Sequence, residues 1–482
     1  MPWFRLNSAS LEQDMALAMN RFLLAASVPV AIASSSFDAG AQPAPARPRR
    51  DTAPNEDLVH AADARTLLDS LRWRIQRLEL AAQRRDDGSA TTFALDSTGF
   101  RVVSGDGRYQ IRLRGYFQSD GRFFQQDVQR PAAGTLLLRR VRPVWEATVG
   151  SRLDFRLMPD FGEGKTTLYD AHMDIRLNRA LVVRTGKFKP PLGLERLQSA
   201  IDLAFIERAH PTSLAPNRDV GIQVQGALAG PVITYAAGFF DGATDIGMGD
   251  GDLDDHKDFV GRLFLTPLAS TSPGRRAEVG IGVAVSRGRR DGTVAAASLP
   301  TYRSPGQQAA FAFRGDGTAA GTTIADGLHR RLAPQGYFYA GPSGTMVEYT
   351  RSSYVVRRGT ASADLAQAAW QVTSTLLLTG ERASYSGIRP RRAFDPARGQ
   401  WGALELAVRA TGLTIDDDAF PVFADSATQV RKETSTGAAV NWYLNRGVRL
   451  QVNYLITRYV GGAASGNREP ERVLMTRLQH SF

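Results

Sequence analysis

The 482-residue sequence contains no cysteine, so it can build neither a disulfide framework nor a cysteine-based metal site or nucleophile. It is also poor in lysine, because only five of its 59 basic residues are lysines: Lys165, Lys187, Lys189, Lys257 and Lys432. Long apolar runs are equally scarce. The only one, residues 22–33, is too short to span a bilayer as a helix, which excludes a helical transmembrane protein.

Sequence signatures of catalysis are also missing. No histidine stands at a metal-ligand spacing, and there is no G-x-S-x-G nucleophile motif. A barrel enzyme could still assemble a Ser-His or Asp-His constellation in space, but we expect no enzyme, no metal and no cofactor. The acidic stretch 249–258 begins like a calcium loop, but Gly261 stands where a bidentate glutamate is required, so a solvated loop is expected.

The formal net charge of +11 is spread through the chain rather than gathered in one patch, which disfavours nucleic-acid binding. Because most of the positive charge is arginine, two interpretations remain open. Arginine abundance could reflect codon usage alone. Alternatively, the arginines form an electropositive interior that attracts anions, in which case their positions on strands decide the matter.

The amino-terminal region divides into three predicted segments. Residues 1–41 combine the apolar run with a small-residue site, Ala39-Gly40-Ala41, and are predicted to be a signal peptide. Residues 42–56, rich in proline, alanine and arginine, are predicted to be a linker. Residues 57–86 carry apolar side chains at alternating spacings of three and four, which predicts a periplasmic helix, either packed on a barrel mouth or paired as a short coiled coil between subunits.

Residues 91–482 show a different pattern, in which apolar and polar residues alternate. In residues 135–149 the apolar face includes Val141 and Trp145, and the other face carries Arg140, Arg142 and Glu146. Period two predicts β-strands, as a soluble sandwich would also show. However, the strands are about ten residues long and are joined by alternately tight and long connections, which is typical of a transmembrane β-barrel.

We count sixteen strands and therefore predict an all-β fold, a sixteen-stranded antiparallel transmembrane barrel. The strands are expected near 108–117, four within 135–189, then 219–228, 231–240, 258–266, 277–287, 327–339, 345–356, 368–379, 401–413, 435–445, 447–459 and 472–482. The connection near 380–400 is longer than a periplasmic turn should be, and the strand registers within 288–344 and 380–400 do not follow from the pattern. The last strand alternates up to Phe482, as in barrels of the bacterial outer membrane.

The same strand registers predict which side chains face the lumen. A lumen ladder is expected from Arg108, Arg112, Arg114, Arg140, Arg142, Arg152 and Arg156. Four carboxylates face the same way: Glu146, Asp154, Asp170 and Asp174. Tyr169 is expected on the apolar, lipid-facing side. The arginines and acids could form ion pairs that leave the lumen wall neutral. However, the excess of arginine favours a positive lumen, and rings of arginine or lysine select anions in pores.

The connection after Phe188 is too apolar for a solvated loop, so it should fold inward and narrow the pore. It would bring five cations near the narrowest point: Lys187, Lys189, Arg196, Arg208 and Arg218. The arginine fork suits phosphate and carboxylate oxygens.

Several stretches resemble the phosphate-selective porin O and P family: LLLRRVRP, GKFKPPLGLERLQSA, IERAHPTSLAPNRDVGIQV, WQVTSTLLLTGE and NWYLNRGVRLQVNYLITR. The resemblance covers nearly all of the barrel. It implies an outer-membrane barrel of a Gram-negative bacterium, usually a homotrimer, whose inward-folded third loop forms an anion site. Lys187, Lys189 and Arg196 fall in the matching motif. The members named for phosphate concentrate lysines at the centre, whereas this chain has few.

The function expected from the sequence is passive diffusion of anions, phosphate or polyphosphate among them, across the outer membrane. The first alternative is a general or carbohydrate-type diffusion porin whose arginines are neutralised. A TonB-dependent receptor would need a much longer plug before the barrel. An adhesive protein that tethers the membrane through its amino-terminal helix is a further alternative.

Overall fold

The computed structural model describes residues 73–77, 79, 90–125, 133–249, 254–268 and 277–482. The chain falls into two units, Met1–Ser89 and Ala90–Phe482. Of the first unit, residues 73–77 and 79 are helical, within the predicted helix 57–86. The rest of that helix, the signal peptide and the linker lie outside the described residues. None of the described residues belongs to a helix long and apolar enough to cross a membrane.

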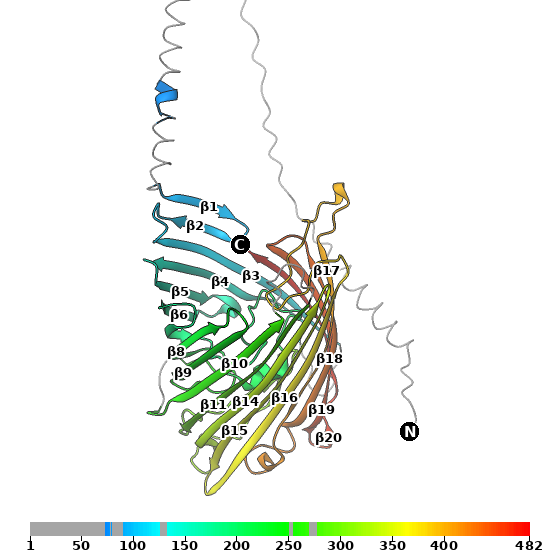
Figure 1. The fold of residues 1–482 in the computed structure, drawn as a ribbon. Helices are drawn as coiled ribbons and strands as arrows, with labels where there is room; N and C mark the ends of the chain where they lie inside the picture. The colour runs from blue at the N-terminus through cyan, green and yellow to red at the C-terminus, as the bar shows by residue number, and fades with distance from the viewer. Residues whose placement is uncertain (1–72, 78, 80–89, 126–132, 250–253, 269–276) are drawn as a thin grey trace, which may run out of the picture. The chain divides into compact units, whose positions relative to one another are not determined.

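The second unit is a closed antiparallel barrel (Figure 1). Its described residues form sixteen wall strands, as predicted. They are β3 (Gln110–Gln125), β4 (Thr135–Val149), β5 (Leu153–Asp160), β6 (Thr167–Arg176), β7 (Val182–Phe188), β8 (Asp219–Leu228), β9 (Ile233–Phe240), β10 (Asp258–Leu268), β11 (Ala277–Asp291), β14 (Ile324–Ala340), β15 (Ser343–Arg358), β16 (Ala361–Leu377), β17 (Ala403–Thr414), β18 (Val430–Tyr443), β19 (Val448–Ala463) and β21 (Glu471–Ser481).

The barrel closes where β21 pairs with β3, from Ser481 opposite Tyr116 to Arg472 opposite Gln125. Phe482 continues the seam, because its main chain exchanges two 3.1 Å hydrogen bonds with Gly115. The first residues of β3 pair instead with a hairpin that the sequence analysis did not predict, β1 (Thr92–Asp96) and β2 (Gly99–Val103).

Short turns gather at one end of the barrel and long connections at the other. We call these the short-turn end and the long-loop end. The connections also contain strands of two or three residues and short 3₁₀ helices: β12 (Tyr302–Arg303), β13 (Ala309–Phe311), β20 (Gly466–Asn467), η1 (Gly162–Gly164), η2 (His210–Leu214), η3 (Pro396–Arg398) and η4 (Asp417–Ala419). There are two exceptions: the connection 378–402 is long although it joins β16 to β17 at the short-turn end, and β15 is joined to β16 by only Gly359 and Thr360 at the long-loop end.

Alternation along the strands sets the two faces as the sequence predicted. Trp145, Phe155 and Leu157 are exposed on the outside, whereas Arg140 and Arg142 are buried on the inside. Outward apolar side chains can be solvated by lipid, and inward polar ones need partners within the barrel.

One predicted orientation is wrong. A register shift between Met158 and Pro159 places a bulge in β6, so Leu168 rather than Tyr169 is exposed on the outside. Tyr169 turns inward, where the guanidinium carbon of Arg142 lies 3.7 Å from its ring centroid. A bulge adds one residue to a strand and thereby reverses the alternation locally.

Candidate functional site

The connection between β7 and β8, residues 189–218, folds into the barrel and is called here the constriction loop. Gly186, just before it, has a φ of 117°, and a Cβ there would lie 2.3 Å from the carbonyl oxygen of Ala171. Only glycine therefore fits this position near the end of β7. The apolar side chains of the loop, such as Leu194, Leu203 and Ile206, are fully buried, as their composition predicted.

Polar side chains of β15 and β17–β19 hold the main chain of this loop. Glu348 accepts hydrogen bonds from the main-chain N–H groups of Leu194 (2.7 Å) and Glu195 (3.2 Å). Asn453 accepts one from Ile206 (2.6 Å). Glu195 itself forms a buried ion pair with Arg409 at 2.5 Å. Because buried main-chain groups need partners, these contacts seat the loop against one side of the barrel.

The connection 378–402 supports the same loop from the short-turn end. The hydroxyl group of Tyr385 donates to the carbonyl oxygen of Leu194 at 2.7 Å, and its ring stacks on Tyr337 with centroids 5.4 Å apart. Gln198 donates back to the carbonyl oxygen of Tyr385 at 2.8 Å. The unusual length of this connection, noted from the sequence, thus corresponds to an inward-folded segment.

A cavity of about 1100 Å³ remains between the constriction loop and the opposite wall. Its lining is rich in arginine and comes mainly from β3–β8, the constriction loop and the connection 378–402. The arginines and the lysine that line it are Arg112, Arg114, Arg139, Arg140, Arg142, Arg156, Arg179, Arg184, Lys189, Arg196, Arg208, Arg218, Arg262, Arg389 and Arg446.

Five of the seven residues predicted for the lumen ladder line this cavity: Arg112, Arg114, Arg140, Arg142 and Arg156. The other two do not, and their predicted place in the ladder is corrected. Arg108 lies in the turn between β2 and β3, where it is exposed, and Arg152 is exposed in the turn after β4. The strands begin only at Gln110 and Leu153, so the alternation was extended too far into both turns.

Most arginines of the wall are paired with carboxylates. Arg114 and Arg156 lie 2.6 and 2.8 Å from Glu146. Arg142 lies 2.8 Å from Asp160, and Arg184 lies 2.6 Å from Asp174. On this side of the cavity the positive charges are therefore largely cancelled.

Glu207 of the constriction loop pairs in a similar way with arginines of β3 and β4. It binds Arg139 at 2.7 Å and Arg122 at 3.1 Å, and it lies 4.0 Å from Arg140. Arg140 also donates to Gln118 at 2.7 Å. Although burial opposes ionisation, the surrounding arginines hold the pKa of Glu207 below its usual range.

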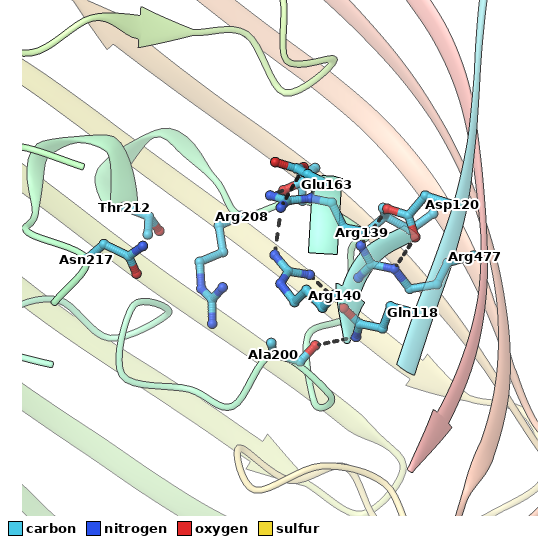
Figure 2. A network of polar contacts seen from close by, with 12 residues as sticks. Gln118, Asp120, Arg139, Arg140, Glu163, Ala200, Arg208, Thr212, Asn217 and Arg477 are labelled. Carbon is cyan, nitrogen blue, oxygen red and sulfur yellow. Dashed lines mark hydrogen bonds and ion pairs between the residues drawn. The ribbon is translucent and has the colours of Figure 1, made fainter. Parts of the chain in front are cut away.

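The cations of the constriction loop are held differently. Lys189 donates to the carbonyl oxygens of Leu197 (3.2 Å) and Gln198 (2.9 Å). Arg208 donates to those of Glu195 (3.1 Å) and, again, Gln198 (2.8 Å). Figure 2 shows Arg208 drawn between Thr212 and Asn217 on one side and Arg139 and Arg140 on the other.

Arg196 is also held by neutral oxygen acceptors. It donates to the carbonyl oxygen of Thr212 (2.5 Å) and to the side-chain oxygen of Asn217 (3.2 Å). Within the part of the chain that the structure describes, Lys189, Arg196 and Arg208 form no ion pair with a carboxylate. Carbonyl and amide oxygens satisfy the hydrogen-bond donors of a cation without cancelling its charge.

Burial and mutual repulsion among these cations lower their pKa values. The pKa of Lys189 falls well below its ordinary value because of burial and of the nearby charges of Arg218 and Arg208. Burial and the charges of Arg208 and Arg218 lower the pKa of Arg196 to about 9. Such an arrangement destabilises the positive charges until an anion is present.

Two of the five predicted constriction residues differ from this group. Arg218 lines the cavity but forms an ion pair with Asp170 at 2.5 Å. Lys187 is buried, pairs in register with Ala171, and is not one of the residues lining the cavity. Sequence reasoning missed Glu195, Glu207 and Asp202 of the loop, although they are the only three acids in the stretch 189–218.

The model of the family described as phosphate-selective porin O and P matches residues 111–482. The chain belongs to this family. It is therefore an outer-membrane porin of a Gram-negative bacterium, as predicted, and its family and fold are those of channels rather than enzymes.

Solved structures of similar fold are outer-membrane channels. The outer membrane channel DcaP of Acinetobacter baumannii is 12% identical, with a TM-score of 0.50, and the match covers 80% of this chain and 100% of that chain. The anion-selective porin from Comamonas acidovorans is 12% identical, with a TM-score of 0.49 over 78% and 100% of the two chains. The trimer form of OmpT from Vibrio cholerae is 11% identical, with a TM-score of 0.47 over 78% and 100%. No curated protein matches the chain.

Proposed function

We propose that this porin conducts small anions, phosphate and polyphosphate among them, by passive diffusion past the cations of the constriction loop. The observation that carries the proposal is the way Lys189, Arg196 and Arg208 are held. Among the residues that the structure describes, their hydrogen bonds go to carbonyl and amide oxygens, and the Nε of Arg196 is buried without a partner, so no carboxylate pairs with these charges inside the barrel. Uncancelled charge in a narrow, low-dielectric passage attracts anions and repels cations.

The hydrogen bonds of these cations also allow a bound anion to leave. Lys189 and Arg208 already share the carbonyl oxygen of Gln198, so an arriving phosphate exchanges these bonds for its own rather than filling empty donors. Conduction requires binding weak enough to permit departure, and such an exchange limits the net gain.

A second candidate function is general or carbohydrate-type diffusion without anion preference. The paired wall favours it, because Arg114, Arg142, Arg156 and Arg184 each have a carboxylate partner. The two candidates differ only in whether the charge of the constriction loop dominates the permeation path.

Reversal potential in a planar bilayer under a salt gradient decides between them. Anion selectivity in chloride, followed by current block when phosphate is titrated in, supports the proposal. Anion selectivity without block supports a general anion pore. Absence of selectivity, or preference for cations, refutes the proposal. It would indicate that the neutralised wall, rather than the constriction loop, determines ion selectivity.

The family resemblance further implies a homotrimer in the outer-membrane lipid, and this stays a prediction. Chemical crosslinking of the protein in outer-membrane vesicles, followed by denaturing electrophoresis, tests it directly.

A further inference from the structure

Arginines also gather on the outside of the barrel, where β11, β14 and β15 lie side by side (Figure 1). Arg287 of β11 is registered directly opposite Arg330 of β14. Arg351 of β15 stands one step diagonally from Arg330, opposite Leu332. We call Arg287, Arg330 and Arg351 the outer arginine cluster.

The outward orientation of these side chains follows from their neighbours. Ser286, Arg331 and Ser352, each next in sequence to a member of the cluster, are buried on the lumen side. All three cluster arginines are exposed. Because successive side chains on a strand point to opposite faces, the cluster faces lipid or the lipid–water boundary.

Exposed aromatic side chains continue this registered row on β9 and β10. Phe239 of β9 is paired with Phe259 of β10, and Phe259 is paired in turn with Arg287. Both phenylalanines are exposed, and their rings are in edge contact at 5.6 Å. The next outward residues toward the barrel centre, Val285 and Leu332, are exposed and apolar. Exposed aromatics at the edge of an apolar band mark the headgroup level.

In the described part of the chain, only one of the three positive charges in the outer arginine cluster is balanced by a carboxylate. Arg330 forms an ion pair with Asp364, but Arg287 and Arg351 form none with any residue that the structure describes. Like charges directly opposite each other on neighbouring strands destabilise a sheet. In the same registered row, β9 and β10 carry Phe239 and Phe259 instead of arginine.

We propose that the outer arginine cluster binds the phosphate groups of the glycolipid in the outer leaflet. The row lies toward the long-loop end, which in outer-membrane barrels is the extracellular side. Arginine forks bind phosphate oxygens in pairs, and clustered basic side chains at headgroup level recognise anionic lipids. The inference rests on the membrane location of the barrel and is independent of which solutes the pore conducts.

The test measures lipid phosphorus retained by the full-length protein in detergent after incubation with diphosphorylated lipid A and gel filtration. The variant is R287Q/R330Q/R351Q. The matched control, R101Q/R108Q/R152Q, removes three exposed arginines at the short-turn end. A second variant, R287Q/R351Q, keeps the pair of Arg330 with Asp364 and so guards against misfolding. Resistance of the barrel to detergent unfolding on gels confirms the fold of each protein.

We expect the triple variant to bind lipid A at least about tenfold more weakly, the double variant to be intermediate, and the control to match the wild type. Wild-type protein should retain dephosphorylated lipid A poorly. Equal retention by wild type and triple variant overturns the proposal. So does equal retention of dephosphorylated lipid A, which would indicate acyl-chain packing alone. Displacement by millimolar inorganic phosphate would indicate a small-anion site, and loss of the oligomer in the triple variant would indicate a contact between subunits.

Discussion

Replacing Arg208 with glutamine tests the role of the constriction loop most sharply. Arg208 is held only by the carbonyl oxygens of Glu195 and Gln198, at 3.1 and 2.8 Å, so its removal leaves no buried carboxylate without a partner. Burial and the like charges of Arg218 and Arg142 lower its pKa to about 10, although the nearby Glu195 carboxylate opposes this. The substitution therefore removes an uncancelled positive charge with little direct damage to the ion pairs of the loop.

The magnitude follows from the strength of charge-assisted hydrogen bonds. One such bond to an anion contributes about 1.5–3 kcal/mol, and 1.4 kcal/mol corresponds to about a factor of ten. A Coulomb attraction of about 4 kcal/mol, for charges about 4 Å apart at an effective dielectric constant of about 20, sets an upper bound before screening by salt. We expect the phosphate concentration for half-maximal block in planar bilayers to rise about 10- to 100-fold.

The matched control is Arg114→Gln. It removes one positive charge from the same cavity, but on the wall, where Arg114 lies 2.6 Å from Glu146. We expect R114Q to change phosphate block less than threefold, and R208K to preserve anion selectivity while weakening block. Equal effects of R208Q and R114Q would refute the reasoning, because they would show that only the total charge of the lumen matters.

Two further predictions concern the loop. Burial raises the pKa of Asp202 to about 6, against the opposing charges of Arg449, Arg389, Arg114 and Lys189. Since this folded pKa lies above the ordinary value, the group stabilises the fold at low pH and loses that contribution as pH rises through about 6. Anion selectivity should increase between pH 7.5 and 5 as Asp202 becomes neutral, and D202N should show no such step. Removing Arg409 leaves Glu195 buried and unpaired, so R409M should cost about 3–5 kcal/mol in unfolding by denaturant, whereas R409M/E195M should recover most of it.

Local patterning accounts for how much of the wall was predictable. Period-two alternation is a property of each strand alone, so all sixteen wall strands and the inward direction of Arg140 and Arg142 could be predicted. The errors occurred where the pattern is interrupted. A bulge turns Tyr169 inward, and the turns before β3 and β5 take Arg108 and Arg152 out of the ladder. The β1–β2 hairpin was missed although Asp96-Ser97-Thr98-Gly99 offers a turn signal between alternating residues.

The candidate site was less predictable because its partners are far apart in sequence. That the connection after Phe188 folds inward could be predicted from its apolar composition. Which of its cations lack a carboxylate partner could not be predicted. That depends on the ion pairs that Glu207 forms with Arg139 and that Glu195 forms with Arg409 across the barrel. Neither contact leaves a local sequence pattern, and the support from Tyr385 comes from a connection almost two hundred residues away.

Together these contacts separate two uses of arginine in one lumen. On the wall, an arginine beside a carboxylate fills the interior and fixes neighbouring strands, and the pair contributes little to the field along the pore. On the constriction loop, carbonyl oxygens hold Lys189 and Arg208 in place without cancelling them. The total charge of the lumen is therefore a poor guide to selectivity. Charge placed where the main chain supplies the acceptors should control which ions pass, and the count of arginines on the wall should not.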